Sequence, residues 1–175
     1  VLIPSNNRVT ACVSSQAGCS LDCSFCATGK LELKKNLDFY EIYEQIFVLN
    51  KESHKIYNKK LNNIVYMGMG EPLLNYKNVI QSIRLACCPN EGLAISPKRI
   101  TISTSGISKM IDKLAHENLR CNLALSLHSA DDEIRSSLMK INDSNNVESL
   151  SKSLKYFYEQ TKIRPTIEYT LLKGC

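Results

Sequence analysis

The chain has 175 residues, of which 43% are apolar and 22% charged, and this composition is ordinary for a globular domain with a sizeable core. The formal net charge of +5 permits a polyanionic partner without requiring one. No apolar run is long enough to cross a bilayer and no signal-like segment opens the chain, so we expect no membrane association and a cytoplasmic location. Eight cysteines are too few for a disulfide scaffold of this length.

Short β-branched runs alternate with amphipathic stretches along the chain. We predict strands at residues 8–13, 63–67, 99–103, 122–127 and 166–169. Helices are predicted at residues 39–50, with Asp38 as the N-cap, and at 76–87, 108–117 and 147–161, while the Lys-rich residues 51–60 are predicted to form a surface connection. The repeated order of strand, loop and helix predicts a parallel sheet with right-handed crossovers.

The strongest chemical signal is the C-x3-C-x2-C spacing of Cys19, Cys23 and Cys26. Three thiolates on one short loop can bind three irons of a [4Fe–4S] cube, whereas a fully protein-ligated cluster uses four cysteines. The open iron can then chelate a small ligand, and the amino and carboxylate groups of S-adenosylmethionine suit such a position. A four-cysteine zinc site usually needs a second C-x2-C pair, which the sequence lacks, so zinc is the weaker alternative.

Polar residues follow the predicted strands at four places. These are the cysteine loop, the turn containing Gly70 and Glu71, the serine at 103, and the Ser-Leu-His run at 126–128. Taken singly, each has an ordinary structural explanation as a turn, a cap or a satisfied polar group. Because the carboxyl ends of parallel strands share one edge of the sheet, the four together predict one functional site.

Several motifs in this order resemble those of the radical S-adenosylmethionine RNA adenine methyltransferases. They are Cys-Val-Ser-Ser-Gln-x-Gly-Cys-x-x-x-Cys-x-Phe-Cys-x-Thr, Gly-Met-Gly-Glu-Pro-Leu, Ser-Thr-Ser-Gly, Ser-Leu-His and Ile-Glu-Tyr. The sequence is most similar to the dual-specificity enzymes that methylate C2 of an adenine in 23S ribosomal RNA and in transfer RNA. The resemblance implies an α/β fold, a partial (β/α) barrel of the radical S-adenosylmethionine type with about five parallel strands and the sixth missing.

Two alternatives remain open beside this resemblance. A sister enzyme that methylates C8 of the same ribosomal adenine, and so confers antibiotic resistance, shares nearly every motif. A non-catalytic module that binds RNA or zinc through the same sheet and cysteines belongs to a different class. The identity of the methylated carbon distinguishes the C2 enzyme from the C8 enzyme. The presence of iron distinguishes either enzyme from the non-catalytic module.

The resemblance also assigns cofactors, partners and residues by matching position. It implies one [4Fe–4S] cluster on Cys19, Cys23 and Cys26 that exchanges a ligand with S-adenosylmethionine, which in turn is contacted by Gly70, Glu71, Ser103, Ser126, Leu127 and His128. The implied partners are 23S ribosomal RNA and transfer RNA as substrates and a reductant such as flavodoxin or ferredoxin. The resemblance further implies a monomer.

Cys12 matches the catalytic cysteine that resolves the protein–RNA adduct in the resembled family, although a free cysteine is most often a small buried hydrophobe. In that family a methyl group carried by a second cysteine becomes a methylene radical and adds to the adenine. Attack by the thiolate that matches Cys12 then releases the product and forms a disulfide. Cys175 does not align with the methyl-carrying cysteine, and the cysteines at 87, 88 and 121 match no ligand.

We therefore expect residues 1–175 to be a radical S-adenosylmethionine core domain that is truncated at both ends. On this expectation the N-terminal RNA-binding helical domain, the general-base glutamate of the family and the C-terminal segment with the methyl-carrying cysteine lie outside the chain. The chain by itself is then not expected to complete a turnover.

Overall fold

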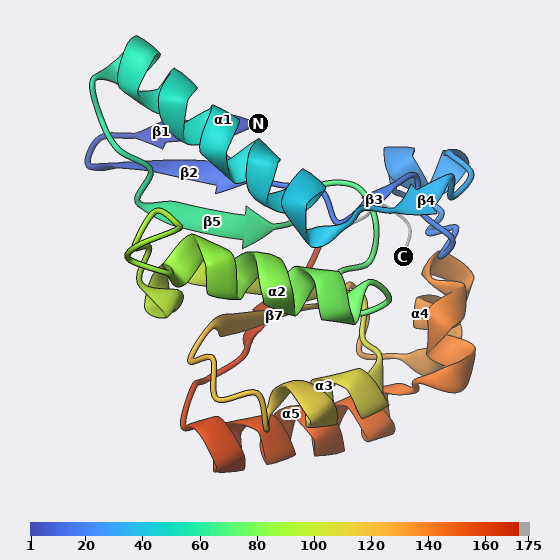
Figure 1. Cartoon of the computed structure of the whole chain (residues 1–175). Helices are drawn as coiled ribbons and strands as arrows, with labels where there is room; N and C mark the ends of the chain where they lie inside the picture. Colours follow the sequence, from blue (N-terminus) through green and yellow to red (C-terminus); the bar gives the residue numbers. More distant parts are fainter. Residues whose placement is uncertain (172–175) are drawn as a thin grey trace.

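The computed structural model describes residues 1–171 and contains a six-stranded sheet in the order β1-β2-β5-β6-β7-β8 (Figure 1). These strands are β1 (Leu2–Ser5), β2 (Arg8–Cys12), β5 (Asn63–Tyr66), β6 (Ile100–Thr104), β7 (Asn122–Ser126) and β8 (Thr166–Glu168). The last five pair in parallel and are the five predicted strands, each end within one residue of its predicted position. The predicted α/β fold with five parallel strands is thus confirmed.

The sequence did not predict strand β1, which pairs antiparallel with β2 and covers its free edge. This strand has four residues and includes Pro4, which cannot donate to a ladder and therefore belongs at an edge. A second, two-stranded sheet was also missed, formed by β3 (Gln16–Ala17) and β4 (Lys35–Asn36). Both features are too short to give a periodic signal in the sequence.

Within residues 1–171, five α-helices connect the strands, together with three short 3₁₀ turns. The α-helices are α1 (Phe39–Tyr57), α2 (Tyr76–Cys87), α3 (Ser108–Leu114), α4 (Asp132–Leu138) and α5 (Val147–Thr161), and the 3₁₀ turns are η1 (Ala27–Lys30), η2 (Pro97–Arg99) and η3 (Lys140–Ser144). Helices α2 and α5 have the predicted bounds, α3 ends three residues early, and α4 was not predicted.

As predicted, Asp38 caps α1, because its carboxylate accepts the Glu41 N–H while the Glu41 carboxylate accepts the Asp38 N–H.

The prediction of a surface connection at residues 51–60 was wrong for its first seven residues, because α1 continues to Tyr57. The polar residues of this segment occupy the solvent side of the last two turns. Ser53 is the exception, since it is buried and its hydroxyl donates to the Lys59 carbonyl at 2.7 Å. The helix then ends at Asn58, which takes the left-handed conformation at φ +51°.

Helices α1, α2, α3 and α5 cover one face of the sheet, with α1 and α2 in front of β2 and β5 and α3 beside α5 (Figure 1). The core between them is built largely of isoleucines, such as Ile42 and Ile46 of α1, Ile64 of β5 and Ile102 of β6, all fully buried. Burying each such side chain contributes about 1.5–3 kcal/mol. With the helices on one face, the opposite face of the sheet is left to line the inside of a partial barrel.

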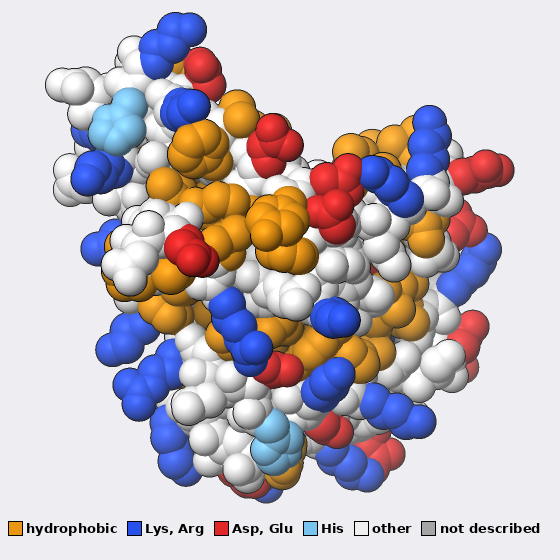
Figure 2. All heavy atoms as spheres, viewed as in Figure 1, with side chains coloured by type: hydrophobic (Ala, Val, Ile, Leu, Met, Phe, Trp, Pro, Cys, Tyr) orange, Lys and Arg blue, Asp and Glu red, His pale blue; other side chains and the backbone are white. Residues whose placement is uncertain are grey.

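Hydrophobic side chains show on the surface along α1, while Lys and Arg side chains gather along the edge where the strands begin (Figure 2). None of the helices in the described part of the chain combines the length and the apolar character needed to cross a bilayer.

Candidate active site

The loop with the three predicted ligand cysteines is closed at its base by the β3–β4 pair. Within it, the Cys26 N–H donates to the Cys23 carbonyl at 3.1 Å, and the Gly29 N–H donates to the Cys26 carbonyl at 3.0 Å. A β-carbon on Gly29 would lie 2.7 Å from the Cys23 oxygen, so the loop folds back too closely for any larger residue. These turns gather the three thiols on one side of the loop.

The far side of the same loop rests on the end of α4. The Ser24 N–H donates to the Leu138 carbonyl at 3.0 Å, and Lys140 Nζ lies 2.5 Å from Asp22 Oδ2. Asp22 itself takes a left-handed conformation, with φ +49°. The cysteine loop is therefore held between the β3–β4 pair and a segment more than 100 residues later in the chain.

A cavity of about 300 Å³ lies at the carboxyl edge of the sheet, between the cysteine loop and the ends of β5 to β8. Eight of the ten predicted site residues line it, namely Cys19, Cys23, Cys26, Gly70, Glu71, Ser103, Ser126 and His128. They come from four separate segments of the chain. The structure therefore brings the four predicted polar features together in one place.

Gly70 is required by the turn that follows β5. Its φ of +94° is unfavourable for any residue with a side chain, and a β-carbon there would lie 2.4 Å from Cβ of Gln16. The Gln16 side chain fixes this turn, since its Oε1 accepts the Glu71 N–H at 2.8 Å. The turn after β5 is thus tied directly to the base of the cysteine loop.

Glu71 is a buried carboxylate, with 3% of its surface exposed. Its Oε1 accepts the Leu73 N–H at 3.0 Å, and its Oε2 accepts both the N–H and the hydroxyl of Ser105 at 2.8 Å. Burial raises the pKa of Glu71, and the hydrogen bonds from Ser105 and Leu73 act against that rise. The Thr104 side chain also hydrogen-bonds to this carboxylate and acts against the rise in pKa, so its lone-pair positions, about four in number, are shared among donors of the chain.

Glu168 at the end of β8 is a further cavity residue that was not predicted. Its Oε2 accepts the hydroxyls of Ser103 at 3.0 Å and Ser126 at 3.2 Å. Each serine proton is thereby used, which leaves the serine oxygens as acceptors toward a ligand. The Ile-Glu-Tyr motif was the only signal for Glu168, and its pairing with the serines depends on the register of β7 and β8, in which Ser126 lies opposite Glu168.

His128 follows β7 in a left-handed conformation, with φ +59°. Its Nδ1 accepts the Thr170 N–H at 3.1 Å, and its ring meets that of Phe25 edge-to-face with centroids 4.6 Å apart. Burial lowers the pKa of His128, and the nearby carboxylate of Glu168 acts in the opposite direction. The imidazole is therefore neutral at neutral pH, with its proton on Nε2.

Two predicted site residues, Cys12 and Leu127, do not line the cavity. Cys12 ends β2, and since its neighbour Ala11 is buried under the helices, alternation places Cys12 on the inner face of the sheet. Leu127 acts through its backbone, which donates to the Glu168 carbonyl at 3.0 Å and accepts from Arg135 Nε at 3.1 Å. The role of Cys12 stays a prediction, and Cys175 lies outside the described residues.

The donor set fits an iron–sulfur cluster better than one metal ion. Burial raises the pKa of Cys19, and it raises that of Cys23 to about 11, so ligation must displace protons from these thiols. Among residues 1–171, no three His, Cys, Asp or Glu side chains converge closely enough to hold a single ion. A cluster needs no such convergence, because each thiolate binds a different iron.

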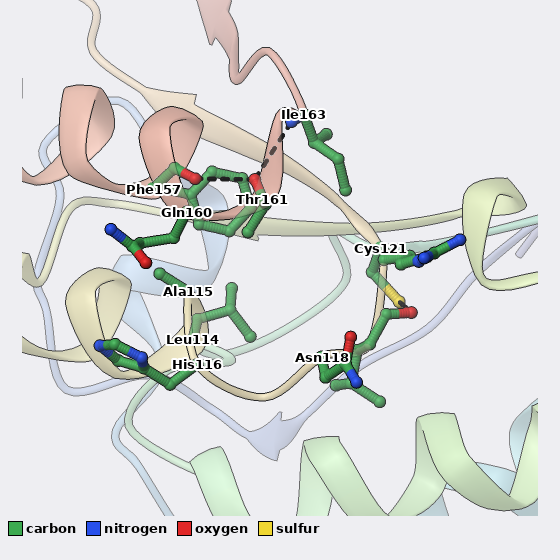
Figure 3. A pocket seen from close by; sticks show the side chains of 11 residues that line it. Leu114, Ala115, His116, Asn118, Cys121, Phe157, Gln160, Thr161 and Ile163 are labelled. Atoms are coloured by element: carbon green, nitrogen blue, oxygen red, sulfur yellow. Dashed lines mark hydrogen bonds between the residues drawn. The ribbon is translucent and has the colours of Figure 1, made fainter.

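A second cavity, of about 340 Å³, lies at the opposite edge of the sheet, between the ends of α3 and α5 (Figure 3). Its polar groups bond mainly to their own neighbours, as in Thr161, whose hydroxyl donates to the Phe157 carbonyl and accepts the Ile163 N–H. No predicted site residue lines it. The larger cavity is therefore not the candidate active site.

The chain belongs to the radical S-adenosylmethionine (radical SAM) superfamily, whose family model, described as "Radical SAM superfamily", matches residues 13–174. Membership implies a [4Fe–4S] cluster and S-adenosylmethionine as cofactors. A crystal structure of a radical SAM methyltransferase from Sphaerobacter thermophilus superposes with a TM-score of 0.95 at 39% identity, covering 99% of this chain and 50% of that one. Streptococcus suis SuiB bound to S-adenosylmethionine shares the fold alone, with a TM-score of 0.61 at 21% identity, covering 97% of this chain and 36% of that one.

Curated relatives indicate which radical SAM enzymes the chain is most similar to. The chain is 52% identical over 174 residues to the "Probable dual-specificity RNA methyltransferase RlmN" of Flavobacterium psychrophilum, covering 99% of this chain and 50% of the relative. It is 47% identical over 170 residues to the "Dual-specificity RNA methyltransferase RlmN" of Campylobacter jejuni, covering 97% of this chain and 47% of the relative. The chain thus spans about half the length of the curated relatives it matches.

Proposed function

We propose that residues 1–175 form the radical SAM core domain of an RNA methyltransferase that acts on C2 of adenine in 23S ribosomal RNA and transfer RNA. The observation that carries the proposal is a cavity at the carboxyl edge that joins the three thiols to Glu71, Ser103, Ser126 and His128. The similarity to dual-specificity RNA methyltransferases over almost the whole chain supports RNA as the substrate.

Each cavity residue has a specific part in this proposal. Cys19, Cys23 and Cys26 would hold the cluster, which when reduced would supply the electron for cleaving the sulfonium of S-adenosylmethionine. The negative charge of Glu71 at the cavity wall would bind the cofactor's ammonium group in a charge-assisted hydrogen bond. Ser103 and Ser126, oriented by Glu168, accept hydrogen bonds from its hydroxyl groups.

Backbone groups and one further thiol complete the assignment. The turn at Gly70 lets the chain approach the cofactor closely, and the backbone at Leu127 fixes the position of His128. Cys12, on the inner face of the sheet, is the resolving thiol of the proposed reaction. A low-potential protein such as flavodoxin or ferredoxin supplies the electron.

The first test is anaerobic reconstitution with iron and sulfide, followed by electron paramagnetic resonance of the reduced protein with and without S-adenosylmethionine. We expect a [4Fe–4S] signal that shifts when the cofactor is added. A signal indifferent to S-adenosylmethionine, or a colourless protein with stoichiometric zinc, would contradict the proposal. Mass spectrometry of the methylated nucleoside then separates methylation at C2 from methylation at C8.

A further inference from the structure

Arg135 in α4 is the largest fully buried side chain described in this protein, with 0% of its surface exposed. Its Nε donates to the Leu127 carbonyl at 3.1 Å, its Nη1 to Asn142 Oδ1 at 2.7 Å, and its Nη2 to the Ser105 carbonyl at 2.5 Å. A longer contact of 3.4 Å joins Nη2 to the Ser126 carbonyl. All four acceptors are neutral oxygens.

The charge of Arg135 therefore has no direct counter-ion within residues 1–171. The carboxylate of Asp132 attracts this charge only through space, since it is hydrogen-bonded to Asn142 and to the Val147 N–H. Burying an unpaired cation costs free energy. If Arg135 served only to hold these carbonyl oxygens in place, a neutral donor would be enough. An anionic partner that is not a side chain would remove this cost.

The position of Arg135 indicates what that partner is. Ser105 accepts from the guanidinium through its carbonyl and donates to Glu71 through its N–H, so Arg135 lies one residue behind the cavity wall. Three residues further along the same helix, the Leu138 carbonyl accepts the Ser24 N–H at 3.0 Å, so the helix that carries Arg135 also supports the cysteine loop. A cluster held by three thiolates is anionic, and reduction adds another negative charge.

We propose that Arg135 is the buried counter-charge of the iron–sulfur centre, and that its fixed positive charge raises the reduction potential of a cluster held by Cys19, Cys23 and Cys26. Arg135 acts through space and touches neither the cluster ligands nor the substrate, so it is a positioning and tuning residue. This inference rests on the proposed function, because it requires a cluster at the predicted cysteines. Reduction potentials of such clusters depend on net charge, hydrogen bonding and solvent exposure.

The test compares R135Q with R135K in the full chain, reconstituted anaerobically and titrated with redox mediators while the reduced cluster is followed by electron paramagnetic resonance. We expect R135Q to have a more negative midpoint potential, with a roughly tenfold lower ratio of reduced to oxidised cluster at the parent's midpoint, or about 59 mV for one electron. R135K keeps the charge and is expected to keep the potential. R84Q, which removes an exposed arginine at the opposite edge, is the matched control and should not change it.

The outcomes separate this inference from the proposed function. An unsubstituted chain that takes up no cluster would overturn both. A cluster with the same potential in R135Q as in the parent would overturn only the inference, and so would an R135K variant that shifts as far as R135Q. If circular dichroism shows that R135Q does not fold, R135K decides, since an unchanged potential supports the inference and a negative shift overturns it.

Discussion

The two edges of the sheet carry cavities of similar size but opposite character. At the carboxyl edge, the wall of the 300 Å³ cavity contains the buried carboxylate of Glu71, with the buried guanidinium of Arg135 directly behind it. At the amino edge, the charged residue that lines the 340 Å³ cavity is Arg120, whose side chain is exposed. Buried charge, and not cavity volume, therefore distinguishes the edge that carries the candidate active site.

The backbone differs between the edges as well. Left-handed positions at the carboxyl edge include three glycines, Gly18, Gly70 and Gly106, each of which has another chain segment where its β-carbon would stand. At the amino edge, left-handed positions are occupied by residues with side chains, namely Asn58, Ala94, Asn118, Arg120 and Lys162. The carboxyl edge also has Asp22 at φ +49° and His128 at φ +59°, so glycine is required there only where another segment approaches the backbone closely.

The largest expected effect is the loss of the cluster on removing one ligand thiol. C23A should retain little or no iron after anaerobic reconstitution, because three thiolates are the minimum set for this type of site. C121A removes a buried thiol at the amino-edge cavity and should retain the full complement. Iron and sulfide content per chain measure the difference, and equal iron in the two variants would contradict the assignment of the ligands.

E71Q should weaken binding of S-adenosylmethionine by about tenfold or more, because a charge-assisted hydrogen bond contributes about 1.5–3 kcal/mol. The NH₂ group of the new amide would face the N–H of Leu73 or Ser105 and cannot accept its hydrogen bond. This lowers the free energy of unfolding by about 1–3 kcal/mol. The matched variant E117Q alters a carboxylate that binds Tyr76 and Arg84 instead. Calorimetry on the reconstituted protein should show that E117Q binds the cofactor like the parent, and equal affinity in E71Q would refute the role of Glu71.

Exchanging glycine and alanine at left-handed positions should have opposite effects at the two edges. G70A is expected to lower the free energy of unfolding by about 1–2 kcal/mol, since it adds strain and meets Gln16. A94G relieves the strain at φ +53° on an exposed loop and should raise that free energy by up to about 1 kcal/mol. Urea unfolding measures both, and a change of the same sign in both variants would be inconsistent with this comparison.

The smallest effect concerns His128 and pH. Since its pKa is lowered in the folded chain, the unfolded chain binds the proton more readily below the ordinary value of 6.5. The contribution of His128 to stability is therefore complete above about pH 6.5 and falls as the pH drops through the interval down to the folded pKa. Thermal unfolding should show a weaker acid dependence in H128Q than in the parent, and a folded His128 that titrates above 6.5 by NMR would contradict this prediction.

The repeating strand and helix architecture could be predicted because most of its elements have a recognisable local residue pattern. Short β-branched runs predicted β2, β5, β6, β7 and β8, and amphipathic stretches predicted α2 and α5, almost to the residue. Strand β1 and the β3–β4 pair were missed because two to four residues carry no period. Helix α4 was missed because it contains only two apolar residues, Ile134 and Leu138, which are too few to show a helical repeat.

The site was predictable where strand ends and spaced cysteines marked it. Glu168 and Arg135 were not predicted, because both make contacts between segments that are distant in the sequence. Glu168 meets the serines through the register of β7 and β8. Arg135 donates to oxygens of three separate segments, at Leu127, Asn142 and Ser105. Leu127 was predicted as a cofactor contact and is seen to hold the end of β7 through its backbone. Sequence spacing cannot show which groups meet across a sheet.

The contact between the cysteine loop and α4 has a consequence for how the protein is made. Ser24 is hydrogen-bonded to Leu138, so the ribosome must synthesise 114 further residues before the loop can find its support. A nascent chain that has exposed only its cysteines holds them on an unsupported loop. The support for the cysteine loop is therefore added only after the chain has been synthesised beyond β7.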